Sequence, residues 1–468
     1  MREDQGLQPA PIEGLSVELL QMVLSELPDV SSLRAAALSC PLLYGVFLDA
    51  DTTITTQVLL NQIDESVLPE AELAFLSSSL HHGPEPKYRH VVVDFITQNL
   101  RQRQTATSSW SLQKALQLER LHLCVSELTR KFVHTTLTTY PNTQSKCTAT
   151  RLERCRIERA FYRFELYRDL FRMLPKIYAE LPIHAEQKQL FFACFAPWEN
   201  EQLGCIHDFL VRAVSPAFND IAEHDVAWGA FRVEYDNRID SPFIQHVLSC
   251  GLKKLLSVIL AETYPERHQL LYSRGFPPIT DNFLYEGLQS ANEHNDHVFL
   301  DSWSRENEAL LTRRSFFADP DSGPRDAWQW AYRDEPWTNR VYQEDRDNLR
   351  RWGYVMWDRC RLDSVGILQV PWEDTRSSTD LLLEEQEATR QRAYMENSWE
   401  KREKIYRSGA VGRWSWGDES QVLWPDGVAP RQRRSAPARI KPDSLQEARD
   451  VLRMMKLPSL LPSHIEAN

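Results

Sequence analysis

The sequence predicts a mostly α protein, in which an N-terminal module of three short helices precedes a large, irregular helical domain. Apolar residues recur every three to four positions over segments that are too long for strands. The Val-rich piece at 91–93 is expected to lie inside a helix rather than in a strand. The segments with helical spacing are residues 110–134, 150–174, 198–213 and 242–262.

The first helix of the N-terminal module is expected between Leu15 and Leu27. Pro28 ends it, because the residue before a proline leaves the α region and proline has no amide hydrogen to donate. Met22 lies beside its apolar stripe. The stripe itself consists of Leu15, Leu19, Leu20, Val23, Leu24 and Leu27.

Two further short helices follow before a polar gap at residues 49–56. Asp29 or Ser31 can cap the second helix, which carries Leu33 and Leu38. Pro41 begins the third helix, with Ser39 as its expected cap and Leu42, Leu43, Val46 and Phe47 inside it. Three helices of this length cannot bury their apolar surface among themselves, so the module needs a partner surface.

Several features of the larger domain can be interpreted in more than one way. Residues 380–407 form a charged helix that Gly409 ends. Ten of the 14 tryptophans lie at or after Trp328, and burial in a core is a more common fate for them than an aromatic recognition surface. In the segment 150–174, one face is apolar, and the arginines that we expect to stay on the polar face are Arg151, Arg154, Arg159 and Arg168.

Composition divides the chain into five parts. A basic run follows the helical body and is a nuclear import signal, a contact for an anionic patch or, as we favour, a solvated tail: Arg431, Arg433, Arg434, Arg439 and Lys441. The expected parts are a disordered N-terminus (1–11), the module (12–50), a helical body (51–424) with a possible boundary near 300, a Pro/Arg-rich mobile segment (425–444), and a short terminal helix and tail (445–468).

Charge and composition exclude several classes of function. The 468 residues carry a net charge of −12, which argues against bulk electrostatic binding to nucleic acid. No apolar run is long enough to span a membrane, and the first 14 residues have no apolar core of the kind found in signal peptides. None of the eight cysteines forms a CxxC pair, which is typical of reduced thiols. We therefore expect a soluble protein of the cytoplasm, the nucleus or both.

Signatures of the familiar catalytic sites are absent from the sequence, and we expect a protein without enzymatic activity, cofactor or metal. His207–Asp208 and His224–Asp225 are adjacent pairs, and neighbouring residues on a helix do not face each other, so cap or surface roles are expected. Cys205 is a weak candidate nucleophile. His294 and His297 could offer two metal ligands, although a solvated turn explains them better.

The N-terminal block GLSVELLQMVLSELPDVSSLRAAALSCPLLYGVF resembles the F-box motif. Ser16 stands where that motif has proline, and Tyr44 or Phe47 stands near its usual tryptophan. The blocks at 156–171, 195–210 and 350–368 are similar to uncharacterised F-box-like proteins of filamentous fungi. The resemblance implies an F-box-like module that binds the Skp-type adaptor of a cullin–RING ligase through Leu15, Glu18, Leu19, Leu20, Val23, Leu24, Leu27, Leu33 and Leu38.

Two functions are compatible with these patterns. In the first, the protein is a substrate receptor that brings a client protein to the ubiquitin ligase, and the chain itself needs no nucleophile. In the second, it is a non-catalytic helical scaffold, and its F-box-like stripe packs against its own helical body.

Overall fold

The computed structural model describes residues 11–80, 88–101, 109–139, 148–172, 184–230, 241–272, 283–291, 317–333, 340–375 and 378–425. Within these ranges the fold is mostly α, as predicted. The strands described, β1 (Val411–Gly412) and β2 (Val422–Leu423), are two residues long and pair antiparallel. The expected N-terminus up to residue 10, the basic run and the terminal helix lie outside the described residues.

The three predicted N-terminal helices are present. A short 3₁₀ turn (η1, Pro11–Gly14) leads into α1 (Val17–Ser25), α2 (Val30–Ala37) and α3 (Pro41–Asp49). Asp29 caps α2, because its carboxylate accepts a hydrogen bond from the amide of Ser32 at 2.6 Å. The expectation that Ser39 caps α3 is wrong: Cys40 is the residue before Pro41, and the hydroxyl of Ser39 donates to the carbonyl of Ala36 instead.

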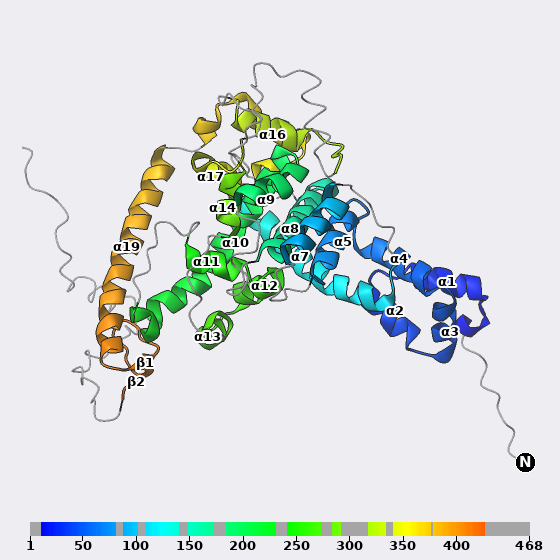
Figure 1. Ribbon diagram of the computed structural model, residues 1–468, viewed down its shortest axis with the longest axis horizontal. Coiled ribbons are helices and arrows are strands. Elements are labelled where there is room, and N and C mark those ends of the chain that lie inside the picture. Colours follow the sequence, from blue (N-terminus) through cyan, green and yellow to red (C-terminus); the bar gives the residue numbers. More distant parts are fainter. Residues whose placement is uncertain are drawn as a thin grey trace, which may run out of the picture.

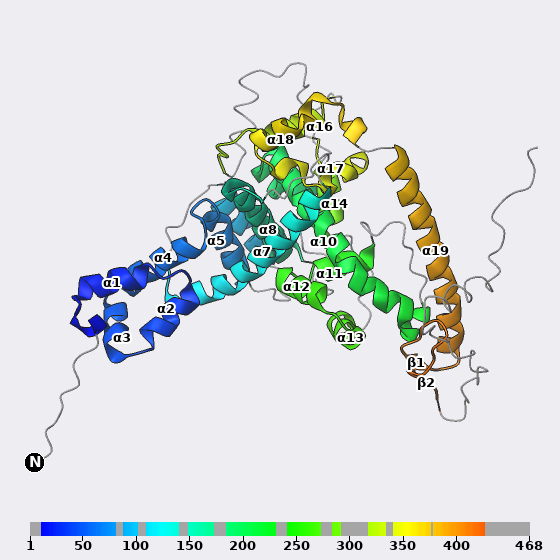
Figure 2. The same cartoon turned by 180° about the vertical axis from the view of Figure 1, so that it is seen from behind.

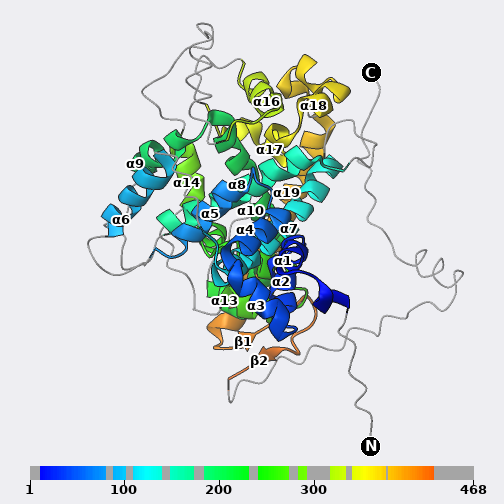
Figure 3. The same cartoon turned by 90° about the vertical axis from the view of Figure 1, so that its right-hand side faces the viewer.

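The predicted polar gap at 49–56 is also wrong, because α4 (Asp51–Gln62) runs through it. The threonines of α4 make this segment look polar in the sequence, but Ile54, Val58 and Leu59 form a buried face. This face packs between the module and α7 (Leu112–Thr139), so α4 and α7 together connect the module to the body. The module consequently lies at one end of the molecule (Figures 1 and 2), and α1–α4 are in front when that end faces the viewer (Figure 3).

The body is built around α8 (Arg151–Phe171), which contacts α5 (Leu68–Ser77), α7 and α10 (Pro197–His224). Most side chains of α8 are buried around its whole circumference. The other helices of the body are α6 (Tyr88–Phe95), the π-helical turn η2 (Ile96–Arg101), α9 (His184–Leu190), α11 (Pro242–Leu248), α12 (Leu252–Leu260), α13 (Tyr264–Tyr272), α14 (Phe283–Ser290), α16 (Gly323–Ala331), α17 (Asp347–Arg351) and α18 (Arg359–Val365). Short 3₁₀ turns lie at η3 (Phe192–Cys194), η4 (Val226–Ala230), η6 (Glu344–Arg346), η7 (Tyr354–Met356), η8 (Ile367–Gln369) and η9 (Trp372–Thr375).

The segment 242–262 is two helices rather than one. Gly251 separates α11 from α12 with a φ of 89°, a conformation that residues with a Cβ rarely adopt. A Cβ at this position would lie 2.9 Å from the carboxylate of Glu165, which accepts the amide of Leu252 and so fixes the start of α12. Among the described residues, no single helix is long and apolar enough to cross a membrane, whereas α11 and α12 would reach that length only as a pair bent by 113°.

The opposite end of the molecule from the module is formed by α19 (Ser378–Arg407) and the β1–β2 hairpin (Figure 1). Gly409 ends α19 with a φ of 79°, as predicted. A small separate core holds this end together and consists of Val226, Ile405, Ala410, Trp414 and Val422. The tryptophans described in the C-terminal region mostly support the prediction of a buried core, since Trp328, Trp330, Trp352 and Trp357 are buried.

Buried arginines on α8 overturn the expectation of a uniformly solvated arginine face. Arg151 and Arg154 are exposed, but Arg159 is buried together with Arg156 and Arg163. Burial of three guanidinium groups requires counter-charges, because an unpaired charge is strongly unfavourable away from water. These counter-charges come from carboxylates on segments far away in the sequence.

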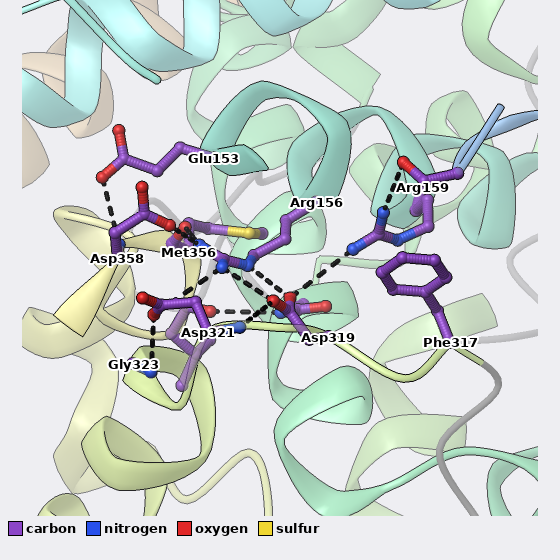
Figure 4. Close-up of polar contacts among 12 residues, drawn as sticks. Glu153, Arg156, Arg159, Phe317, Asp319, Asp321, Gly323, Met356 and Asp358 are labelled. Carbon is purple, nitrogen blue, oxygen red and sulfur yellow. Dashed lines mark hydrogen bonds and ion pairs between the residues drawn. The ribbon is translucent and has the colours of Figure 1, made fainter. Parts of the chain in front are cut away.

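Arg156 is the best-connected of these groups (Figure 4). Its guanidinium donates to both carboxylate oxygens of Asp319, to Asp358 at 2.6 Å and to the carbonyl of Met356 at 3.1 Å. Asp321 in turn accepts the amides of Gly323 and Arg359, each at 2.8 Å. One side chain of α8 thereby joins the turn before α16 to the turn before α18.

We predict that Arg156→Met lowers the free energy of unfolding by about 3–5 kcal/mol, because it removes the cation from the buried carboxylate of Asp358 and the nearest cation from the half-buried carboxylate of Asp319. Chemical denaturation followed by circular dichroism measures the effect. Arg154→Met, on the exposed face of the same helix, is the matched control and should change stability by less than about 0.5 kcal/mol. Equal stabilities of the two variants would contradict the structural role assigned to Arg156.

Candidate partner-binding surface

Helix α1 has two apolar faces rather than one. Leu20 and Leu24 are each 1% exposed and pack into the core that α1 shares with α3 and α4. Leu19 and Val23, one position earlier in each case, are 47% and 46% exposed. Because a step of one residue turns the chain by about 100° around a helix, the same leucine-rich sequence supplies both an inner and an outer stripe.

The remaining residues of the predicted adaptor site divide between these two environments. Leu33 is buried and Leu27 is half-buried against the core. Leu15, Leu38 and Glu18 are exposed. Hydrogen bonds from the backbone amide of Glu18 and from the hydroxyl of Ser16 lower the pKa of the Glu18 carboxyl, so this group is ionised at neutral pH.

Further exposed apolar residues extend the outer stripe of α1. Met22, which was expected beside the apolar stripe, lies on the same outer face of α1. Leu42, Leu43, Val46 and Phe47 all lie in α3, as expected; Leu42 is exposed, whereas the other three are buried. Of the 21 large hydrophobic residues that are exposed in the described part of the chain, ten lie between residues 12 and 48: Ile12, Leu15, Val17, Leu19, Met22, Val23, Leu38, Leu42, Tyr44 and Leu48. We call these ten residues the N-terminal apolar surface.

Hydrogen bonds fix the module on the rest of the protein. The free amides at the start of α2 are satisfied by side chains of other helices: Val30 donates to Gln62 of α4 at 3.3 Å, and Ser31 donates to Glu119 of α7 at 2.9 Å. The side-chain amide of Asn61 donates to the carbonyl of Ser25, at the end of α1, and to the carbonyl of Leu27, just after it. The N-terminal apolar surface is therefore presented by a module that is anchored to the body.

The adjacent pair His207–Asp208 does not occupy the cap or surface position that was expected. Both residues are completely buried in α10, and their side chains contact each other at 3.0 Å. Asp208 also accepts from the hydroxyl of Tyr342 at 2.7 Å and from Arg350 at 2.7 Å. Although burial opposes ionisation, Arg350 and His207 hold the pKa of Asp208 well below its ordinary value.

This buried cluster joins α10 to α11 and to the 340–351 segment. Asp208 and His207 lie on α10, whereas Tyr342 and Arg350 belong to the 340–351 segment, and Gln245 of α11 contacts the other ring nitrogen of His207 at 2.7 Å. Burial raises the pKa of Cys205 well above its ordinary value, so this thiol remains protonated and is a poor nucleophile.

The second adjacent pair has structural roles. Asp225 follows the end of α10 and accepts the amide of Ala227 at 2.8 Å and the hydroxyl of Tyr264 at 3.0 Å. His224 contacts the carbonyl of Trp414 through Nδ1 at 3.0 Å. Among the residues that the structure describes, no group of three or more His, Cys, Asp or Glu side chains could hold a metal ion. His294 and His297 lie outside the described residues.

Comparison of the chain with family models, with curated proteins and with solved structures gave no match in any of the three cases.

The two faces of α1 should respond differently to the same substitution. We predict that Leu20→Ser lowers the free energy of unfolding by about 3 kcal/mol or more, because it removes buried apolar contacts and places a hydroxyl in the core. Leu19→Ser should change it by less than about 0.5 kcal/mol. Thermal unfolding of the two variants beside the wild type measures both effects, and a large loss for Leu19→Ser would mean that the outer stripe is covered by the chain itself.

Proposed function

We propose that this protein is an F-box-type substrate receptor that links a client protein to a Skp–cullin–RING ubiquitin ligase through its N-terminal helices. The observation that carries the proposal is the N-terminal apolar surface. Its outer stripe on α1 is exposed, and no other part of the described chain covers it. Large apolar side chains gathered on one anchored module are typical of a protein–protein interface.

Burial of this surface would contribute favourably to binding. Burial of a Leu or Val side chain contributes roughly 1.5–3 kcal/mol, so burial of four of the outer residues contributes roughly 6–12 kcal/mol before the costs of association. Part of this is lost with translational freedom and side-chain ordering. The anchoring of α2 to α4 and α7 keeps the ordering cost low, because the module does not have to fold on binding.

In this role the body would position a client near the conjugating partner of the ligase. The mechanism is proximity, so the protein would need to hold two partners at a fixed separation rather than supply a reacting group. The module and the α19 end lie at opposite ends of the molecule (Figure 1), which suits a protein that carries one partner at each end.

The alternative function is a non-catalytic helical scaffold that binds no adaptor. One observation favours it for part of the motif: Leu20, Leu24 and Leu33 are buried in the protein's own core. These three residues are therefore unsuitable for testing adaptor binding, since a polar substitution there destabilises the module itself. The outer residues Leu19 and Val23 distinguish the two functions.

We predict that the wild-type chain captures a purified Skp-type adaptor and that the double variant Leu19→Asp/Val23→Asp loses capture at least about 30-fold in affinity. Two carboxylates forced into an apolar interface would each cost about 1–3 kcal/mol, and 1.4 kcal/mol corresponds to a factor of ten. Biolayer interferometry with immobilised adaptor measures the change.

The matched control is Leu260→Asp, because Leu260 is a similarly exposed leucine at the end of α12 in the body. It should bind the adaptor like the wild type, and all variants should share the wild-type melting temperature. Absence of capture by a folded wild type would favour the scaffold function.

A further inference from the structure

A groove lies between α10 and α19, at the end of the molecule opposite the N-terminal module. It has a volume of about 360 Å³ and is lined by Asn219, Glu223, Glu387, Arg390, Gln391, Tyr394 and Met395. These residues come from the last turns of α10 and from the middle of α19. None of them contributes to the N-terminal apolar surface, so the groove is a separate feature of the protein.

Aromatic rings continue the groove onto the hairpin. Tyr394, which lines the groove, is 44% exposed, and its ring lies 5.9 Å from that of Trp416, which is 43% exposed. Trp416 in turn packs against the buried Trp414 at 5.1 Å, which holds the exposed ring in place. Exposed and fixed aromatic faces are good platforms for guanidinium groups, which stack on them.

The polar groups of the groove also favour a cation. Two carboxylates line it, Glu223 and Glu387, against one guanidinium, that of Arg390, which is already paired with Glu387. Asn219 has a buried side-chain oxygen for which the described residues provide no hydrogen-bond donor. A guanidinium that entered the groove would bring both a positive charge and the donor that this oxygen lacks.

The chain itself supplies a segment of this chemistry close to the groove. The described residues end at Pro425, and the next residues carry Arg431, Arg433, Arg434, Arg439 and Lys441. Pro425 lies next to Gly409, directly after the end of α19. The part of α19 that lines the groove, residues 387–395, lies roughly 21–33 Å from Gly409 at 1.5 Å per residue. The extended chain from Pro425 reaches about 26 Å at Arg433, which covers the near end of the groove, and about 46 Å at Arg439, which covers its far end.

We propose that the groove between α10 and α19 is a binding site for the protein's own basic segment, residues 431–441. Its arginines stack on Tyr394 and Trp416 and pair with Glu223. Because the segment is tethered, its effective concentration at the groove is in the millimolar range, so even weak contacts keep the site occupied. Any other ligand of the groove has to displace this segment, and the proposal does not depend on adaptor binding.

Photo-crosslinking of the full chain tests the proposal. The photoreactive amino acid p-benzoylphenylalanine replaces Gln391, which is exposed in the groove, and mass spectrometry identifies the linked peptides after irradiation. The expected product joins position 391 to residues 428–441. The control places the same group at Tyr406, which is exposed and closer along α19 to the point where the chain leaves Pro425.

A segment held in the groove should crosslink to position 391 at least about fivefold more than to position 406, whereas an unbound tail should favour 406 because that site is nearer its origin. Reversal of Arg431, Arg433 and Arg434 to Glu should reduce the product at 391 by at least about fivefold, as should Trp416→Ala. Irradiation of an equal mixture of ordinary and ¹⁵N-labelled chains should give products within one chain.

Three results would overturn the proposal: no product between position 391 and the basic segment, equal yields at 391 and 406, or products that mainly join a labelled to an unlabelled chain. The last of these would mean that the segment binds a second copy of the protein instead.

Discussion

The buried arginines of α8 are the constraint on which the rest of the body depends. Arg156, Arg159 and Arg163 are spaced three and four residues apart and therefore lie on one face of the helix. Each requires a carboxylate, and the carboxylates lie on different segments: Asp319 and Asp358 serve Arg156, and Glu70 and Glu199 serve Arg163. α5, α10 and the turns before α16 and α18 can pack against α8 only in the arrangement that pairs all of these charges.

Such pairs specify an arrangement more than they stabilise it. Taking both charges out of water offsets much of their mutual attraction, whereas the loss of one partner leaves an unpaired buried charge. The effect is visible at Glu70, where burial raises the pKa of the carboxyl even though Arg163 and Arg159 oppose the rise. If α5 packed wrongly on α8, Glu70 and the arginines of α8 would still be removed from water but would lose their counter-charges. The charged face of α8 thus selects the correct neighbours among many helices of similar hydrophobicity.

The periodicity of the sequence predicted the helices well but not which of their faces are buried. α7, α8 and α10 follow directly from the spacing of apolar residues, and Pro28 and Pro41 marked helix boundaries correctly. Arg159, His207 and Asp208 were expected at the surface because polar residues usually lie there, and no local signal shows that distant segments provide their partners. α4 was missed because its three buried apolar residues are outnumbered by threonines and other polar residues. In each case the missing information is a long-range contact.

The same limitation explains why the F-box-like motif supports two functions at the level of sequence. At about 100° per residue, the six apolar residues of α1 and its flanks cover an arc of about 180°. A helix that packs on one surface needs an apolar arc of only about 100°, so one interface does not account for the whole stripe. The structure assigns Leu20 and Leu24 to the protein's own core and leaves Leu15, Leu19 and Val23 exposed. Internal packing and partner binding are therefore not competing explanations for the same residues. The inner half of the stripe anchors α1 in the core, and in the proposed function this anchoring would hold the outer half in place for a partner.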